Sequence, residues 1–431
     1  MADIVSVFAV IALIIFLGFF GEQIFKKTNV PDVLLLMIIG IIIGTYLNWV
    51  DASNFGFAST LFTTFALVFL LFQGALNIDF RTLVRSLSST LELTVLTFAA
   101  TVFVVTLISV LLGFDFIIAL LIGIILGGTS SAVVIPLVSK VDLDENQKYI
   151  LTLESAISDV LSILGTITVL EIMKTGLVQP TGIFNSILSS FSLALVVGVI
   201  VGFAWVILMS KYMILVKSYL LTIAVVMGLY AFVESSFVGA SGAIAAFAFA
   251  LVLGNSRSIL KILKPKNKNS QTNHHLVKNV LLPSTKNFYS EISFFVKTFF
   301  FVYLGILIDF SNLYVFVYGL ILTVGIFLVR PFIVKLVFIN SKVTDKQRTL
   351  MEILIPKGLA AAVLAGLAVQ SGFLPEGVVA SFVNMILSVV FLSILFTSVL
   401  IFFAQKEMFK GLIPFFYNSQ KKEAQQTSDK K

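Results

Sequence analysis

The sequence predicts an all-α membrane protein that crosses the bilayer about thirteen times. Of the 431 residues, 58% are hydrophobic and only 12% are charged. Apolar runs of about 18 residues or more recur along the chain, and a run of that length crosses a bilayer core of roughly 30 Å. Short polar stretches that hold most of the basic residues separate these runs. Together the three observations indicate a polytopic helical fold.

The apolar runs mark the expected crossings in chain order. The first run lacks a basic n-region and a small-residue cleavage site, so we expect a retained helix rather than a signal peptide. The runs lie near residues 5–21, 31–49, 58–78, 90–112, 117–139, 147–173, 187–209, 217–233, 239–256, 292–309, 312–338, 349–369 and 377–403.

The basic residues alternate with the crossings. Loops after odd-numbered segments carry Lys and Arg, as at Lys26, Arg81 and Lys140, whereas loops after even-numbered segments offer only Lys174. Because basic loops stay in the cytoplasm, the N-terminus is predicted outside and the C-terminus inside. The net charge of +7 then reflects membrane orientation, and we expect no nucleic-acid partner.

Composition also limits the chemistry. The chain has no cysteine, and its two histidines, His274 and His275, lie together in a polar loop. Thiolate metal sites, cysteine nucleophiles and a membrane-embedded Ser-His-Asp arrangement are therefore excluded. We expect neither an enzyme nor a resident cofactor. Residues 1–403 are predicted to form one transmembrane domain, with a cytoplasmic linker at about 255–290 and a polar cytoplasmic tail at 404–431.

Three sequence patterns recur in the same order in the two halves of the chain. IDF at Ile78 returns at Ile308, GGTSSAVVIPL at Gly127 returns loosely as PKGLAAAVLAG, and IIGIIIG returns more weakly as FALVLGN. Each pair is seven crossings apart, and an odd separation reverses the orientation. This predicts inverted repeats at about 31–173 and 239–403, an architecture of secondary transporters with broken helices at the midplane. The alternative is that Gly and Phe recur by chance in any membrane protein.

The sixth segment carries acids in an apolar run, TLESAISDVLSI. On a helix, Glu154, Ser155, Ser158 and Asp159 share one polar arc. A charged residue at the centre of a membrane helix costs roughly 2.5–3.5 kcal/mol, so such residues usually line a pathway or a binding site. This arc is the first candidate site.

The fifth segment contains Gly127-Gly128-Thr129-Ser130-Ser131. The glycines favour an opened helix, whose hydroxyls and freed carbonyls are the oxygen ligands that a hard monovalent cation needs. The alternative is a small-residue packing interface.

Three basic residues lie inside apolar segments. Lys357 follows Pro356 in the twelfth segment, where it could offset the partial charges of half-helix ends or pair with Glu154. Lys297 could neutralise Glu154, Asp159 or Asp79, or could reach the interface by snorkelling. We interpret Arg330, before Pro331, as part of a kink near the cytoplasmic side, with contact to lipid phosphates as the alternative.

Several of these stretches together resemble the monovalent cation:proton antiporter superfamily, which holds the sodium/proton exchangers and their potassium-transporting relatives. The resemblance covers the chain up to about residue 403, and ESAISD is similar to the Glu-Ser-x-x-Asn-Asp motif of the electroneutral branch. The stretches are PDVLLLMIIGIIIG, LLFQGALNIDF, GGTSSAVV, ESAISD, SGAIAAFAFALVLGN, FFFVYLGILIDF and PKGLAAA.

The resemblance implies a role for each polar residue. Asp159 would bind the cation or the proton, with Ser155 and Thr129 as further Na⁺ ligands. Glu154 would be the structural partner of a basic residue, and Lys297 and Lys357 would match the family's charge-compensating positions. Two positions depart from the pattern: Ser158 replaces Asn or Asp, and Ser130 replaces a second acid. A single ionisable group in the pair favours one-for-one exchange, and the missing acid leaves the choice of cation open.

The expected function is exchange of Na⁺ or Li⁺ for H⁺ by alternating access. Spans four to six and eleven to thirteen would move against a scaffold, in a homodimer within a prokaryotic cell membrane. A K⁺/H⁺ antiporter is the nearest alternative. A sodium-coupled organic-anion symporter, a cation channel and a non-transporting sensor are alternatives of other classes.

Overall fold

The computed structural model describes most of the predicted transmembrane domain. The described residues are 4–28, 32–47, 49, 56–76, 78, 80–175, 180–211, 218–235, 237–263, 283–308, 313–339, 341 and 343–405. Asp79, both histidines and all but the first two residues of the predicted tail lie outside this set.

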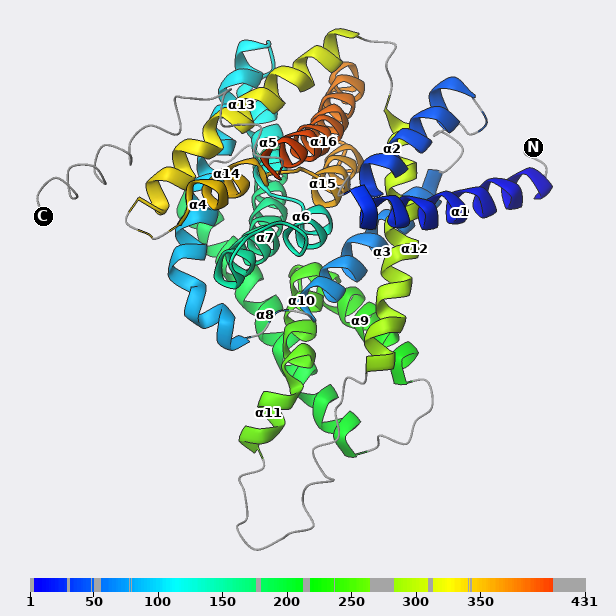
Figure 1. The fold of residues 1–431 in the computed structure, drawn as a ribbon. Helices are drawn as coiled ribbons and strands as arrows, with labels where there is room; N and C mark the ends of the chain where they lie inside the picture. The colour runs from blue at the N-terminus through cyan, green and yellow to red at the C-terminus, as the bar shows by residue number, and fades with distance from the viewer. Residues whose placement is uncertain are drawn as a thin grey trace, which may run out of the picture.

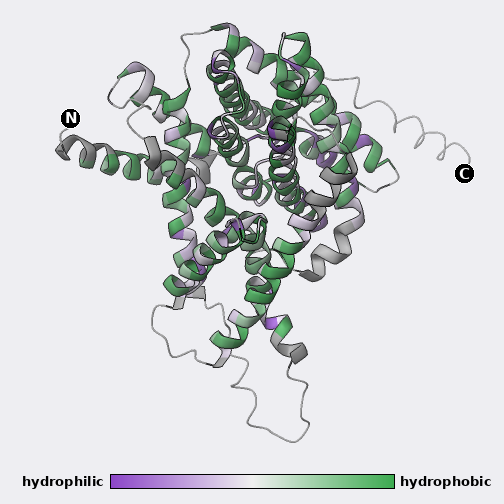
Figure 2. Ribbon diagram, turned by 180° about the vertical axis from the view of Figure 1, so that it is seen from behind, coloured by the Kyte–Doolittle hydropathy of each residue, from purple (hydrophilic) through white to green (hydrophobic). Residues whose placement is uncertain are grey.

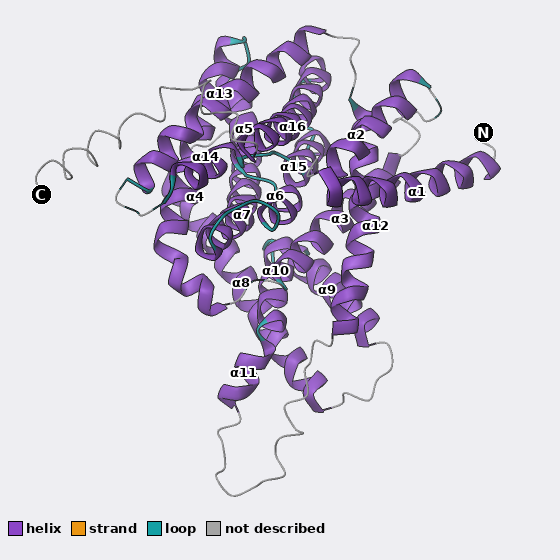
Figure 3. Cartoon of the chain, in the orientation of Figure 1, coloured by secondary structure: helices purple, strands orange, loops and turns teal. Residues whose placement is uncertain are grey.

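The described residues form sixteen α-helices and one π-helix and contain no strand (Figures 1 and 3). This confirms the predicted all-α membrane fold. The elements are α1 (Ile4–Thr28), α2 (Asp32–Ile41), η1 (Ile42–Tyr46), α3 (Gly56–Ala75), α4 (Phe80–Leu111), α5 (Phe116–Gly127), α6 (Ser131–Val138), α7 (Glu145–Thr175), α8 (Pro180–Lys211), α9 (Ser218–Glu234), α10 (Gly242–Gly254), α11 (Ser256–Leu263), α12 (Pro283–Leu307), α13 (Leu313–Val337), α14 (Asp345–Ile353), α15 (Leu359–Gln370) and α16 (Glu376–Gln405).

The helices match the predicted crossings closely. Seven helical stretches among the described residues are long and apolar enough to span a membrane, and six shorter apolar helices accompany them. Each falls on a different one of the thirteen predicted segments. The number of complete crossings stays a prediction. Part of the predicted linker differs: α11 occupies its first residues, and α12 already begins at Pro283.

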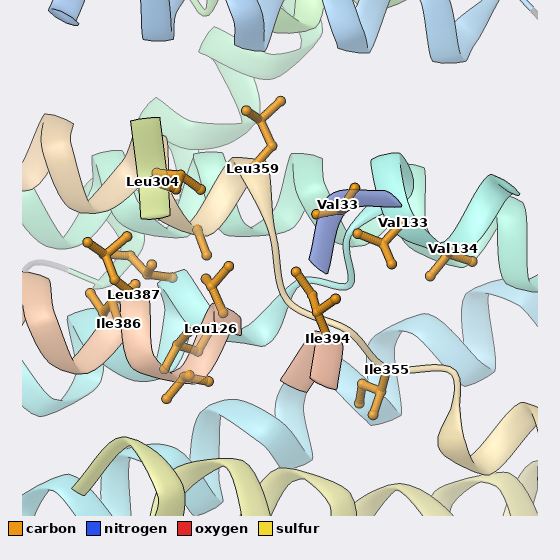
Figure 4. Close-up of a cluster of buried hydrophobic side chains, with 14 of the residues drawn as sticks. Val33, Leu126, Val133, Val134, Leu304, Ile355, Leu359, Ile386, Leu387 and Ile394 are labelled. Carbon is orange, nitrogen blue, oxygen red and sulfur yellow. The ribbon is translucent and has the colours of Figure 1, made fainter. Parts of the chain in front are cut away.

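Two of the predicted crossings are broken near their middle, as the Gly and Pro residues indicated. α5 and α6 are separated by an extended stretch at 128–130, and α14 and α15 by one at 354–358. The two stretches lie side by side, since the Ser130 N–H donates to the Pro356 carbonyl oxygen at 2.8 Å. Figure 4 shows the second stretch from Ile355 to Leu359 among the buried side chains of α5, α6 and α16.

The two sequence repeats make the same contact twice. The Thr45 hydroxyl, at the end of η1, donates to the Ile308 carbonyl at 3.2 Å. In the other half, the Asn255 amide, just after α10, donates to the Ile78 carbonyl at 2.9 Å. In both cases a polar residue next to a repeated glycine holds the end of the helix that carries the repeated Ile-Asp-Phe. This equivalence is what inverted repeats produce; the exact bounds of the repeats stay predictions.

The buried side chains form two large clusters. The larger one joins α4–α7 and α13–α16 with α1, α2, α3 and α12 and with one residue of α10. The other joins α3, α8, α9 and α10 with one residue each of α7 and α12. Apolar side chains also lie on the outside of the helices, as the exposed Phe16, Phe103 and Phe332 do. Figure 2 shows hydrophobic residues along most of the helical ribbon. An apolar exterior around a helical bundle is the surface that lipid tails solvate.

Glycines allow close packing where the two halves meet. Gly305 on α12 faces Gly40 on α2, and a Cβ at Gly305 would meet the backbone of Met37 and Gly40. We expect Gly305→Ala to lower the free energy of unfolding by about 1–3 kcal/mol, because backbone atoms must move apart. Thermal unfolding in detergent measures this effect. Gly228→Ala is the control, since no atom lies within 4 Å of its added Cβ; equal midpoints for the two variants would contradict the prediction.

Candidate functional site

The polar arc predicted on the sixth segment lies on α7, at the centre of the helical bundle. Glu154, Ser155, Ser158 and Asp159 are all buried, with exposures of 4% or less. Because a buried acid in a membrane helix needs a compensating partner, the partners of the two acids define what this arc can do.

The side chain of Asp159, on α7, lies beside the N-terminal end of α6. The Ser131 hydroxyl, on the first residue of that helix, donates to the Asp159 Oδ2 at 2.9 Å. A helix N-terminus carries partial positive charge and favours an anion. Ser131 was not among the predicted site residues. The third hydroxyl of the GGTSS motif was visible in the sequence, but an opened helix has no periodicity to show which hydroxyl faces α7.

The other hydroxyls of the site differ in how they are bonded. The Ser158 hydroxyl accepts from the Thr129 N–H at 2.9 Å and donates to the Ser155 carbonyl at 3.1 Å. The Ser155 hydroxyl donates into its own helix, to the Thr152 carbonyl. The hydroxyls of Thr129 and Ser130 are buried and have no hydrogen-bond partner among the described residues. The opened stretch therefore presents free oxygen atoms to its surroundings.

Glu154 forms a buried ion pair with Arg330. Both guanidinium Nη atoms donate to the carboxylate, Nη2 at 2.7 Å, and Nη1 also donates to Thr97 at 3.0 Å. The Nε atom donates to the Met351 carbonyl at 3.2 Å. The planar guanidinium fits a carboxylate bidentately. With both side chains fully enclosed, the charge of Glu154 is neutralised.

The structure corrects the interpretation of Arg330. This residue is 0% exposed and lies between α4, α7 and α14, so it does not contact lipid phosphates as the alternative held. α13 continues through Pro331, and a kink there stays a prediction. It is also the partner of Glu154, a role proposed for Lys357 or Lys297. The sequence shows that an arginine lies in an apolar segment, but not that its face of the helix points inward.

Lys357 lies at the break in the other half of the protein. Its Nζ donates to the Gly128 carbonyl at 2.8 Å and approaches the Gly127 carbonyl at 3.4 Å. These carbonyls end α5, where a helix carries partial negative charge. This is one of the two placements considered for Lys357. The lysine charge therefore interacts with the carbonyls at the end of α5, and Lys357 forms no ion pair with Glu154.

Lys297 is not part of this site. Its Nζ forms a salt bridge with Asp32 Oδ2, which joins α12 to the first turn of α2. This contact corrects the prediction that Lys297 compensates Glu154 or Asp159; the third candidate, Asp79, lies outside the described residues. Asp32 lies at the predicted cytoplasmic edge of its segment, where an acid is not unusual, so the sequence offered no signal for this pair.

The arrangement offers one uncompensated carboxylate, several hydroxyls and backbone carbonyls. No group of three or more His, Cys, Asp or Glu residues that could hold a metal ion occurs among the described residues. Oxygen ligands with a single negative charge suit a hard monovalent cation. A carboxylate can also bind a proton instead.

Comparison with known proteins gives the family. The family model described as "Sodium/hydrogen exchanger, transmembrane" matches residues 9–406. The chain belongs to this family. Among curated relatives of this exchanger, the "Probable Na(+)/H(+) antiporter 2" of Methanocaldococcus jannaschii is 27% identical over 314 residues, covering 68% of this chain and 69% of the relative. The "Na(+)/H(+) antiporter 1" of the same organism is 26% identical over 376 residues, covering 82% and 81%.

The exchanger also shares its fold with a solved structure. The sodium proton antiporter MjNhaP1 from Methanocaldococcus jannaschii at pH 8 superposes with a TM-score of 0.74 at 22% identity. The match covers 94% of this chain and 98% of that chain. The match shows that the two chains share one fold over nearly their whole length.

The ion pair of Glu154 can be tested by stability. Glu154→Gln leaves the Arg330 guanidinium buried without a carboxylate, and we expect the free energy of unfolding to fall by about 3–5 kcal/mol. Thermal unfolding in detergent measures the change. Glu145→Gln is the control, because Glu145 pairs with Lys148 on the surface with a 75% exposed side chain, and such pairs contribute about 1 kcal/mol or less. A smaller loss for Glu154→Gln than for the control would refute the assignment.

Proposed function

We propose that this exchanger transports Na⁺ or Li⁺ in one direction and H⁺ in the other, with Asp159 binding either ion in turn. One observation carries the proposal: Arg330 neutralises Glu154, whereas the buried Asp159 makes no salt bridge with a described residue. The opened stretch beside it supplies the unbonded hydroxyls of Thr129 and Ser130.

Competition at one carboxylate accounts for the coupling. A Na⁺ ion entering this buried site loses its water, and oxygen ligands must replace that water. Asp159, Ser155 and Thr129 are the proposed ligands, since a hydroxyl that donates one hydrogen bond keeps its lone pairs for a cation. A protonated Asp159 has no net charge to attract the ion. The cation and the proton therefore exclude each other, and each gradient can drive the other ion.

The charges of the site favour exchange of one Na⁺ for one H⁺. The residue before Asp159 is Ser158; an acid at this position would bind a second proton, but a serine does not ionise. The Ser158 hydroxyl is bonded to the Thr129 N–H and the Ser155 carbonyl. Lys357 is bonded to the α5 carbonyls and makes no salt bridge to Asp159. A single titrating group then moves one charge in each direction, which makes the cycle electroneutral.

Alternating access is proposed to come from α4–α7 and α13–α16, which would move as one bundle against a scaffold of the other helices. Within that scaffold, α3, α8, α9 and α10 share a buried apolar cluster. We further propose a homodimer through the scaffold, with the N-terminus outside and the C-terminus in the cytoplasm.

Transport in liposomes tests the proposed function. Purified protein with an internal pH dye is challenged with Na⁺, Li⁺ and K⁺, with and without valinomycin. We expect Na⁺ and Li⁺ to drive proton flux at a rate that valinomycin leaves unchanged. Flux driven by K⁺ alone would identify a K⁺/H⁺ antiporter, and acceleration by valinomycin would rule out electroneutrality. Sodium uptake without proton movement would favour a symporter or a channel.

The role of Asp159 is tested by removing its charge. We expect Asp159→Asn to abolish Na⁺-driven proton flux, at least a hundredfold below wild type, while the protein stays folded, because the amide binds neither ion. The control is Asp142→Asn. Asp142 lies in the loop before α7, and its hydrogen bond to Lys346 holds the pKa of its carboxyl below the ordinary value, so it is charged throughout the assay. Wild-type flux in Asp159→Asn would contradict the proposal.

A further inference from the structure

Two serines in equivalent places hold the two helix breaks. Ser158 on α7 accepts from the Thr129 N–H at 2.9 Å, and Ser393 on α16 accepts from the Lys357 N–H at 2.9 Å. Each hydroxyl also donates to the carbonyl three residues earlier in its own helix, at 3.1 and 3.0 Å. Both side chains are buried. The helices concerned are the sixth and thirteenth predicted segments, which correspond in the inverted repeat.

The two breaks are also bonded to each other between these serines. The Ser130 N–H donates to the Pro356 carbonyl at 2.8 Å. Ser130 follows Thr129, and Pro356 precedes Lys357, so three hydrogen bonds on adjacent residues connect α7 to α16. We call this series the crossing ladder: Ser158 to Thr129, Ser130 to Pro356, and Lys357 to Ser393. It is continuous from the proposed cation site to the opposite half of the protein.

We propose that Ser393 is a positioning residue for the cation site, acting through Lys357 and Pro356 on the stretch that carries Thr129 and Ser130. This inference rests on the proposed function of that site. The residues of an opened helix have no helical partner for their N–H groups, and a buried N–H without an acceptor is costly. Loss of the Ser393 hydroxyl leaves the Lys357 N–H unpaired. If the backbone at Lys357 moves so that this N–H reaches another acceptor, Pro356 moves as well. Ser130 then moves too, because its N–H is bonded to the Pro356 carbonyl.

Lys357 makes a second connection to the same stretch. Its Nζ holds the Gly128 carbonyl, so displacing its backbone also moves the charge that faces the end of α5. The next residue after Ser130 is Ser131, whose hydroxyl donates to Asp159. A change at α16 therefore reaches the carboxylate through hydrogen bonds and the backbone between adjacent residues, with no direct contact between Ser393 and the transported ion.

The neighbouring hydroxyls of α16 provide controls. Ser398 is also buried, and among the described residues its hydroxyl bonds to the Ile394 carbonyl of its own helix. Thr397 donates to the Ile353 carbonyl at 3.2 Å and so keeps the end of α14 attached to α16 when Ser393 is changed. Ser393→Ala should therefore keep the fold, and Ser398→Ala reports the cost of losing a buried hydroxyl outside the ladder.

Hydrogen exchange tests the ladder without any transport measurement. In Ser393→Ala we expect amide exchange to rise about three- to tenfold in peptides covering 354–358 and also in those covering 128–131, as expected for one lost hydrogen bond. Ser398→Ala should leave both regions as in wild type. Unchanged exchange at 128–131 in Ser393→Ala would overturn the inference.

Transport kinetics test the consequence for the site. Ser393→Ala should raise the apparent KM for Na⁺ about three- to tenfold with a smaller change in maximal rate, and Ser398→Ala should not. Ser393→Thr and Ser393→Val form a second pair of equal shape, in which only Thr keeps a hydroxyl; Thr should have the lower KM. The inference would be overturned if Ser393→Ala and Ser398→Ala had equal KM values and Ser393→Thr and Ser393→Val did as well. If the wild-type protein does not exchange Na⁺ for H⁺, the proposed function is refuted. The hydrogen-exchange result for the ladder is independent of that outcome.

Discussion

The hydrogen bond between Ser130 and Pro356 joins the two extended stretches that divide the fifth and twelfth predicted crossings into half-helices. Non-helical backbone at membrane depth is stable only where protein encloses it and satisfies its polar groups. Here each stretch supplies one partner for the other, and serines of α7 and α16 supply the next ones. The four half-helices α5, α6, α14 and α15 can end at one point because these bonds exist. The free hydroxyls and the helix N-terminus beside Asp159 are consequences of that crossing.

The distribution of charge follows from the same enclosure. Glu154 and Arg330 neutralise each other, as do Asp32 and Lys297, and Lys357 faces helix-end carbonyls. Each of these groups has a partner because an isolated charge in such surroundings is expensive. Asp159 has hydroxyl and helix-dipole partners instead of a basic one. A group stabilised in this weaker way can change its state during a cycle, whereas a bidentate arginine pair is better suited to hold helices together.

The sequence predicted much of this, because some signals are local. Apolar length gave the crossings, Gly127 to Ser131 and Pro356 to Gly358 gave the breaks, and helical periodicity placed Glu154, Ser155, Ser158 and Asp159 on one face. The partners of the charged residues were predicted poorly. Arg330 was not predicted as the partner of Glu154, and Asp32 was not among the acids considered for Lys297. Pairing between helices far apart in the chain depends on rotation and depth, and neither is written in the apolar pattern of one helix.

The amino-acid sequence by itself determined that the chain is a helical membrane protein, and that Glu154 and Asp159 share one face of a long apolar helix. These properties depend on hydrophobic length and on spacing along one helix, both of which act over a few turns of chain. Only the tertiary structure decided that Arg330 pairs with Glu154 and that Ser131, rather than a neighbouring hydroxyl, donates to Asp159. It also decided that Ser393 accepts from the Lys357 N–H at the second helix break. Arg330 and Glu154 are 176 residues apart in the chain, and the other two contacts involve the opened stretches. In both situations side-chain geometry in three dimensions selects among partners that are chemically equivalent in the sequence.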